Sequence, residues 1–386
     1  MPLDTKLAAI REQLPAVRDY AYLNTGTYGP MPLSCQQAMI GVLEAEVWRG
    51  RIAPAGSART GSIKDDARAA LARLIGAEPA NVALTRNTTE GMNLAVFGQR
   101  WAAGDEIVTT NIEHGGGLLP VRLAERRFGL TVRQADLTAA DGDVFDAIAP
   151  LIGERTRLVA LSNVSWSTGA LFDLSRMIAY CRPRGVLVAV DGAQSAGAVP
   201  TDMAALDVDY YAFPGQKWLM GPSGTGGLYV RSALLEATEP TIIGTGAVAS
   251  HADLDNYLLW PSAKRFEGAT TANLVGLAGL TASLRFLLDD VGLEWAIARQ
   301  RDLADQAIAG LGAIAGVEVV TPPSHAPLVC FRVGGQRPAD VVARLAEQKV
   351  IGRSVEDTGV VRFSTGFYVL EEEIDRAVDL VAQLAS

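Results

Sequence analysis

Short runs rich in Val, Ile and Leu alternate with stretches of helical periodicity between residues 81 and 191. The runs are NVALT (81–85), DEIVTT (105–110), RLVALS (157–162) and VLVAVD (186–191). Helix candidates lie between them near 88–98, 116–128 and 174–183. Near-continuous apolar strands are buried on both faces, and strands joined by helices run parallel. The sequence therefore predicts an α/β protein with a mostly parallel sheet that helices cover on both sides.

The alternation changes at two points farther along the chain. DYYAF (209–213) and GGLYV (226–230) add two strands without a long helix between them, which indicates a mixed sheet. Beyond about residue 260, two long helices precede the strand candidates VEVV, PLVCFRV and VVRFS and a last helix. We predict three units, which are an N-terminal segment (1–20) that packs with a small domain, a large domain (21–260) and the small α+β domain itself (261–386).

Charge and cysteine content narrow the possible partners. The chain has 386 residues and a formal net charge of −9, which argues against nucleic acid or an anionic membrane and leaves a small molecule as the expected ligand. The longest apolar stretch (274–288) is too short to span a bilayer and contains Arg285. Cys35, Cys181 and Cys330 are widely separated and form no metal-binding spacing. We therefore expect a cytoplasmic protein without a bound metal.

Two charged residues stand in unusually apolar surroundings. Lys217 lies in PGQKWLMGPSGTGGLYV (214–230), among apolar side chains, prolines and glycines. Asp191 ends the strand VLVAVD, which is apolar enough to be buried, and a buried carboxylate needs a cationic partner. Both follow predicted strands of the large domain, and open α/β sheets bind ligands at the carboxyl ends of their strands.

Two further segments follow strands in the same way. NTTEG (87–91) opens a helix, so Thr88, Thr89 and the first backbone N–H groups can form an anion cradle. The alternative is that Asn87 or Thr88 only caps the helix. EHGGGLLP (113–120) carries His114, which either stacks on a flat ring or has a structural role.

A lysine amine, a carboxylate and a phosphate cradle together match the requirements of pyridoxal phosphate (PLP), a cofactor that acts as an electron sink. Lys217 would hold PLP as a Schiff base, and an apolar setting favours the neutral, nucleophilic amine that this requires. Asp191 would keep the pyridine nitrogen protonated, and Gln194 would hydrogen-bond the phenolic oxygen of the ring.

The chain also resembles a known family over essentially its whole length. The motifs, in chain order, are YLNTGTYGPMP, TRNTTEGMNL, TNIEHGG, VDGAQSAG, DYYAFPGQKWLMGPSGTGGLYV, KRFEGAT and VRFSTGFYVLEEEID. They resemble the class V aminotransferase family of fold-type I PLP enzymes, which includes cysteine desulfurases, isopenicillin N epimerase-like proteins and cysteine/cystine C–S lyases. EHxG, VSWSTG, DYYAF, KRFExAT and the EEEI tail are most similar to the C–S lyase branch.

The resemblance implies roles for individual residues. Lys217, Asp191 and Gln194 take the roles given above, His114 stacks on the ring, and Thr88 and Thr89 bind the phosphate. Thr270 reaches the phosphate of a neighbouring subunit, which implies a homodimer with a shared active site. Arg362 and Asn24 bind the substrate carboxylate, with Arg353 as a second candidate. Many relatives have Ser-x-His before the lysine, where this chain has Pro214 and Gln216; we count Gln216 among the cofactor contacts.

The branch implies β-elimination from cysteine, cystine or a related S-substituted cysteine, with pyruvate, ammonia and a sulfur compound as products. Desulfuration, transamination and epimerisation share the early steps and remain alternatives. One desulfurase group has a persulfide-forming cysteine near SVEDTG (354–359), but here there is none, and Cys330 lies within the predicted strand PLVCFRV as a small buried hydrophobe.

Two hypotheses from other classes remain. HGGG (114–117) is similar to a lipase oxyanion motif and AQSAG (193–197) to a nucleophile elbow with Ser195 as nucleophile, paired with His325 or His251. Against this hydrolase hypothesis, Pro200 interrupts the helix that the elbow needs, and Lys217 has no role in it. A non-catalytic protein on the same fold is the other hypothesis, because fold alone does not fix function.

Overall fold

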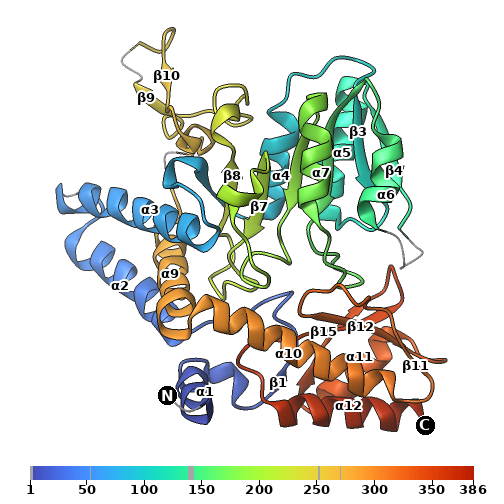
Figure 1. The fold of residues 1–386 in the computed structure, drawn as a ribbon. Helices are drawn as coiled ribbons and strands as arrows, with labels where there is room; N and C mark the ends of the chain where they lie inside the picture. The colour runs from blue at the N-terminus through green and yellow to red at the C-terminus, as the bar shows by residue number, and fades with distance from the viewer. Residues whose placement is uncertain (1–2, 53, 138–142, 251–252, 270) are drawn as a thin grey trace.

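A computed structural model describes residues 3–52, 54–137, 143–250, 253–269 and 271–386 (Figure 1). Its largest sheet has seven strands in the order β2-β8-β7-β6-β5-β3-β4. The strands are β2 (Val82–Thr85), β3 (Glu106–Thr110), β4 (Thr131–Ala135), β5 (Thr156–Ser162), β6 (Leu187–Asp191), β7 (Tyr210–Pro214) and β8 (Gly226–Val230). Strand β8 runs antiparallel to the other six, which are all parallel to one another. The predicted mixed, mostly parallel sheet is confirmed.

Both faces of this sheet are buried. Successive residues of β3, Ile107 and Val108, belong to two different hydrophobic clusters, because neighbouring side chains on a strand point to opposite faces. The helices that cover the sheet are α4 (Thr88–Phe97), α5 (Gly115–Phe128), α6 (Val144–Ile148), α7 (Leu174–Cys181) and α8 (Met203–Leu206). The cluster with Ile107 includes residues of α4 and α5, and the cluster with Val108 includes residues of α7.

A second group of elements lies below this sheet in Figure 1. Its antiparallel sheet has the order β11-β12-β15-β14, with β11 (Val317–Val319), β12 (Leu328–Val333), β14 (Arg353–Val355) and β15 (Val360–Ser364). Helices α10 (Leu293–Gly312), α11 (Pro338–Glu347) and α12 (Glu371–Ala385) pack against it. An ion pair of 2.8 Å between Arg11 and Glu373 ties α1 (Leu3–Glu12) to α12. Strand β1 (Ala21–Tyr22) pairs with β13 (Val350–Ile351).

The remaining helices were predicted less well. Helices α2 (Leu33–Arg49) and α3 (Pro54–Leu74) pack against α9 (Leu274–Arg285), and none of the sequence patterns described above predicts α3. The first of the two long helices expected beyond residue 260 is α9 followed by a π-helix (Phe286–Val291) that ends at Gly292 with φ 84°. A small hairpin, β9 (Val248–Ser250) and β10 (Leu258–Leu259), lies at the edge of the molecule. The domain boundaries that we drew at residues 20 and 260 remain a prediction.

Within the described part of the chain, no helix combines the length and the apolar character that crossing a membrane requires.

Candidate active site

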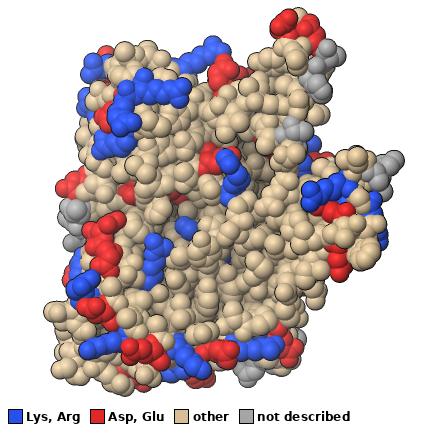
Figure 2. Space-filling model, turned by 180° about the vertical axis from the view of Figure 1, so that it is seen from behind, with Lys and Arg blue, Asp and Glu red and all other residues tan. Residues whose placement is uncertain are grey.

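The predicted site residues converge at one edge of the large sheet. Thr88 follows β2, His114 follows β3, Asp191 ends β6 and Lys217 follows β7, and these four strands run in the same direction. The strands β14 and β15 of the small sheet contribute Arg353 and Arg362 to the same region. Figure 2 shows the molecule from behind, with a hollow between its upper and lower parts.

Lys217 lies in a turn where its amine has lost most of its hydration. The pKa of Lys217 is lowered to about 8, chiefly by burial; Asp191 opposes the decrease, and the nearby cations Arg362 and Arg353 contribute to it. Gly29 makes this position possible, because a Cβ there would lie only 2.3 Å from the carbonyl oxygen of Lys217. A lysine with such a pKa is partly neutral at neutral pH and therefore nucleophilic.

Asp191 is buried at the end of β6, with 4% of its surface exposed. Burial raises the pKa of Asp191, and the charges of Lys217 and His114 oppose that rise. One oxygen, Oδ1, accepts a hydrogen bond of 2.9 Å from the backbone N–H of Ala193. Within the described residues, no lysine or arginine forms an ion pair with this carboxylate. A cationic ring nitrogen would supply the missing partner.

The glycines of HGGG let the start of α5 approach this carboxylate. A Cβ at Gly117 would lie 3.0 Å from Asp191 Oδ2, and a Cβ at Gly116 would lie 2.6 Å from Thr89 Oγ1. His114 caps α5, since its Nδ1 accepts a hydrogen bond of 3.0 Å from the N–H of Gly116. Burial lowers the pKa of His114, so the ring is neutral near pH 7. The structural role considered for His114 is therefore present, and it leaves the ring beside the cleft.

The start of α4 combines a cap with unused donors. Asn87 caps the helix by accepting a hydrogen bond of 2.9 Å from the N–H of Glu90. Thr88 is buried, and its Oγ1 has no hydrogen-bond partner among the described residues. The capping alternative is thus correct for Asn87, and it leaves the hydroxyl of Thr88 unused.

Gln194 and Gln216 both precede Lys217 in the sequence. Gln194 Oε1 accepts from Trp218 Nε1, and its Nε2 donates to the carbonyl of Gly26, both at 2.9 Å. One N–H of the Gln194 amide therefore remains for a ligand. Gln216 Oε1 is buried and has no partner among the described residues. Thr270, the last predicted cofactor contact, lies outside the described residues.

The two predicted arginines share one hydroxyl group. Arg353 Nη1 and Arg362 Nη2 both donate to Thr27 Oγ1, at 2.9 and 3.1 Å, and Thr27 donates to Asn24 Oδ1 at 2.7 Å. Arg362 also donates to the carbonyl of Trp166 at 2.9 Å. This network brings together Asn24, Arg353 and Arg362, which the resemblance assigns to the substrate carboxylate, and that assignment stays a prediction. Thr27, which holds them together, was not predicted.

Arg362 keeps unused donors although it is completely buried. Its Nε has no hydrogen-bond partner among the described residues, and no carboxylate of those residues lies within ion-pair distance. Burial lowers the pKa of Arg362 to about 10, which still leaves it charged at neutral pH. A buried, unpaired guanidinium is costly, so this geometry calls for an anionic ligand.

Glu113 is a site residue that the sequence analysis missed. Its two carboxyl oxygens accept hydrogen bonds from Thr110 Oγ1 at 2.6 Å and Ser162 Oγ at 2.5 Å. Ser162 lies opposite Asp191 in the register of β5 and β6. The pKa of Glu113 is raised to about 7, chiefly by burial; the hydrogen bonds from Ser162 and Thr110 oppose the rise, and the charge of Asp191 adds to it. Its place directly before His114, at the end of a strand, was the available signal.

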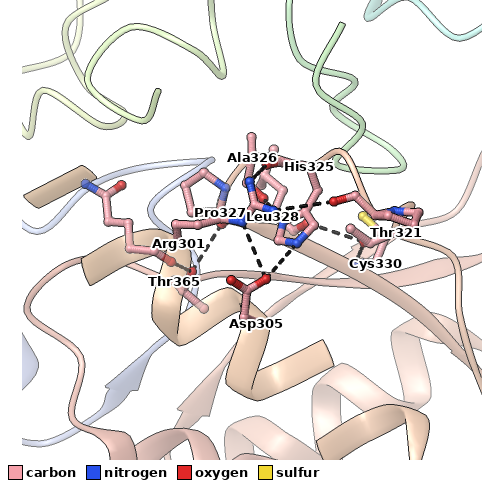
Figure 3. Close-up of polar contacts among 11 residues, drawn as sticks. Arg301, Asp305, Thr321, His325, Ala326, Pro327, Leu328, Cys330 and Thr365 are labelled. Atoms are coloured by element: carbon pink, nitrogen blue, oxygen red, sulfur yellow. Dashed lines mark hydrogen bonds and ion pairs between the residues drawn. The ribbon is translucent and has the colours of Figure 1, made fainter. Parts of the chain in front are cut away.

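The hydrolase hypothesis fails on the geometry of Ser195. The hydroxyl of Ser195 is fully buried and bonds to the hydroxyl of Tyr211 at 2.6 Å, and the segment after it forms turns in place of a helix. His325 instead bonds to Asp305 of α10 (Figure 3). His251, the other candidate, lies outside the described residues.

The three cysteines are free and buried. Burial raises the pKa of Cys35 to about 11 and the pKa values of Cys181 and Cys330 to about 12. Cys330 lies in β12 opposite Arg362, as expected for a core strand. These thiols therefore have little thiolate at neutral pH.

The residues present fit PLP. The unpaired hydroxyl of Thr88 and the start of α4 suit a phosphate, and the buried Asp191 suits a protonated ring nitrogen. Lys217 has the lowered pKa that a covalent link to an aldehyde requires. Gln194 has one free donor for the phenolic oxygen.

Comparisons with known proteins agree with this geometry. The sequence profile "Aminotransferase class-V" matches residues 43–377. A "Probable cysteine desulfurase" of Methanothermobacter thermautotrophicus is 31% identical over 97% of both chains, and the "Isopenicillin N epimerase" of Streptomyces clavuligerus is 31% identical over 94% of both. The solved complex of "the cystine C-S lyase C-DES and its reaction product cysteine persulfide" has a TM-score of 0.91 and 32% identity, covering 96% of this chain and 99% of that one. The chain therefore belongs to the class-V aminotransferase family of PLP-dependent, fold-type I enzymes.

Proposed function

We propose that this protein is a PLP-dependent C–S lyase. It cleaves cysteine, cystine or a related S-substituted cysteine by β-elimination and releases pyruvate, ammonia and a sulfur product. The buried guanidinium of Arg362, with Arg353 beside it, supports an α-amino acid as substrate, because a guanidinium without a carboxylate partner matches a carboxylate ligand.

The burial and raised pKa values of the three cysteines are the observation that favours elimination over persulfide-forming desulfuration. A desulfurase of that kind needs an exposed, reactive thiolate to attack the substrate sulfur. All three thiols here are buried with raised pKa values, and the turn between β14 and β15 holds Glu356, Asp357 and Thr358. Elimination needs no protein thiol, since the electrons left at Cα expel the sulfur.

Each of the predicted site residues would have a distinct role in this reaction. When bound, PLP supplies an electron sink for the pair that deprotonation leaves at Cα. Lys217 would hold the cofactor covalently, and once the substrate displaces it, its amine would take the Cα proton. Asp191 would hold a proton on the ring nitrogen, and His114 would cover the ring. Arg362, with Arg353, would bind the carboxylate and so orient the Cα–H bond.

Cleavage of the C–S bond and release of the products need no further protein group. The C–S bond breaks, and the sulfur leaves with its electron pair and gains a proton. Water then completes the release of pyruvate and ammonia. From cystine the sulfur product is cysteine persulfide, and from an S-substituted cysteine it is the corresponding thiol.

Product analysis tests the proposal. The holoenzyme is mixed separately with cysteine, cystine and an S-alkylcysteine, and pyruvate, alanine and ammonia are quantified against substrate loss. We expect pyruvate and ammonia in equal amounts. Alanine as the main product would establish desulfuration, and racemised substrate with no pyruvate would establish epimerisation.

We further propose that the protein is a cytoplasmic homodimer. Helix α2 exposes an apolar stripe that includes Val47 and Trp48, which are 74% and 83% exposed in the single chain. Such a surface is costly in water, and the implied contact of Thr270 with a partner's cofactor requires a second subunit. Light scattering should give twice the mass of the chain, and a fully active monomer would contradict the proposal.

A further inference from the structure

His325 lies in the loop TPPSHAP between β11 and β12, away from the residues proposed to touch the cofactor. The side chain is 97% buried, since only 3% of its surface is exposed. Figure 3 shows its ring between the loop backbone and Asp305 of α10. The proposed reaction assigns no role to this residue.

Both ring nitrogens of His325 face hydrogen-bond acceptors. Nε2 lies 2.9 Å from Asp305 Oδ1, and Nδ1 lies 2.9 Å from the carbonyl oxygen of Ala326. A backbone carbonyl cannot donate, and an ionised carboxylate only accepts. Both nitrogens must therefore carry a proton for both bonds to form, and a ring with two protons is positively charged.

The charged groups around the ring all come from α10. Asp305 contacts His325 Nε2 at 2.9 Å and Arg301 Nε at 3.4 Å, so one carboxylate lies between the imidazole and a guanidinium. Arg301 also donates to the backbone carbonyl of His325 at 2.9 Å. The segment packed on the other side, residues 169–171, is Gly-Ala-Leu and adds no titratable side chain.

The backbone of this loop is joined to a loop of the active site. His325 forms a β-bridge with Ala170, and Ala326 N–H donates to the carbonyl of Gly169 at 2.9 Å. Gly169 and Ala170 in turn bond to Ser165, which closes a tight loop around Trp166.

The carbonyl oxygen of Trp166 accepts a hydrogen bond from Arg362. The indole ring of Trp166 packs edge to face against the ring of His114, with 5.0 Å between the ring centroids. A continuous set of contacts therefore leads from His325 to the carboxylate site.

We propose that His325 is a charged positioning residue. Its doubly protonated ring, bound between Asp305 and the carbonyl of Ala326, holds the Trp166 loop and thereby fixes the guanidinium of Arg362. When the ring loses a proton, one of its two bonds is lost, the loop loosens, and binding of a substrate carboxylate weakens. The functional half of this inference rests on the proposed role of Arg362.

Nitrogen NMR of the histidine rings tests the charge directly. The chain has only three histidines, so the His325 signals of the ¹⁵N-labelled holoenzyme can be assigned by their loss in His325→Gln. We expect both ring nitrogens of His325 to carry protons at pH 7. A neutral ring at pH 7 would overturn the inference, whatever reaction the enzyme catalyses.

Glycine binding tests the link to the active site. The change in cofactor absorbance on adding glycine reports binding of an α-amino carboxylate and does not depend on C–S cleavage. Asp305→Asn keeps an acceptor for the ring but removes the charge that holds its second proton. As the pH rises, the glycine affinity of Asp305→Asn should therefore fall earlier than that of the wild type. At the pH where the two proteins differ most, the variant should bind glycine about two- to tenfold more weakly.

Asp302→Asn is the matched control, because Asp302 is an exposed carboxylate on the same helix. Its glycine affinity should depend on pH as that of the wild type does. The comparison therefore separates the effect of Asp305 from titrations elsewhere in the site. His325→Gln should bind glycine weakly and without this pH dependence, while its cofactor spectrum stays as in the wild type. Identical profiles for Asp305→Asn and the wild type would refute the coupling. If glycine produced no response in the wild type, the carboxylate site and this coupling would both fail, and NMR would still decide the charge.

Discussion

Replacing Glu113 by Gln should change how the stability of the apoprotein depends on pH. Burial raises the pKa of Glu113 from 4.5 to about 7, so the folded protein prefers the protonated carboxyl. Below pH 4.5, the folded and unfolded chains both hold this proton, and the preference has no effect. Between pH 4.5 and 7, the unfolded chain releases the proton first, so stability falls as the pH rises. Above pH 7 the loss is complete, and the free energy of unfolding is lower by roughly 3 kcal/mol because of the raised pKa.

The glutamine variant lacks this penalty and keeps a side chain that can bond to Thr110 and Ser162. Urea unfolding of the apoprotein at pH 5 and pH 8 measures the effect. Relative to the wild type, Glu113→Gln should gain about 2–3 kcal/mol between these two values. Glu78→Gln, at an exposed position, should show no such gain. A difference between Glu113→Gln and the wild type that stays constant with pH would mean that Glu113 is already ionised in the folded protein.

Three other substitutions test the site. Lys217→Ala should abolish turnover and the covalent link to the cofactor while the fold persists, and mass spectrometry after borohydride reduction of the wild type should find the label on Lys217 and on no other lysine. Arg362→Ala should weaken amino-acid binding by roughly a hundredfold or more, since it removes a buried cation from a carboxylate, and leave the cofactor spectrum near normal; unchanged affinity would assign the carboxylate to another group. Replacing all three cysteines by Ala or Ser should preserve the rate per folded, cofactor-loaded enzyme, with some loss of stability at Cys330, whereas loss of activity with one cysteine would favour desulfuration.

The sequence predicted the parts of the fold that depend on local patterns. The inner strands are apolar on both faces, and Asp191 and Lys217 stand out because charged residues are rare at such positions. Strand β4 (TVRQA) lies at the sheet edge, where it is partly exposed and polar, so its pattern is weak. Helix α3 is held by its packing against α9, which no local pattern reports.

Thr27 and Glu113 were not predicted because their roles depend on contacts between distant segments of the chain. Thr27 contacts arginines that lie 326 and 335 positions away in the sequence, and its hydroxyl gains a role only when three segments meet. Glu113 likewise depends on Ser162, 49 positions away, for one of its two bonds. A threonine or a glutamate in a loop is common, so neither residue is distinctive until the strands and loops are assembled.

The charges of the site are arranged so that they fix one half of an amino acid and leave the other half free. Arg353 and Arg362 lie on the small-sheet side, whereas Asp191 and Glu113 lie at the ends of the large-sheet strands. This separation orients the α-carboxylate and the reacting Cα identically for any α-amino acid, because neither feature depends on the side chain of the substrate. Discrimination between sulfur substrates must therefore come from the walls that the side chain meets. A cavity of about 530 Å³ lined by Thr89, His114, Leu119, Trp166 and Asp357 provides those walls. If the protein is the lyase proposed above, this cavity leaves room for a group larger than a bare thiol, so we expect cystine or an S-substituted cysteine to be preferred over cysteine itself.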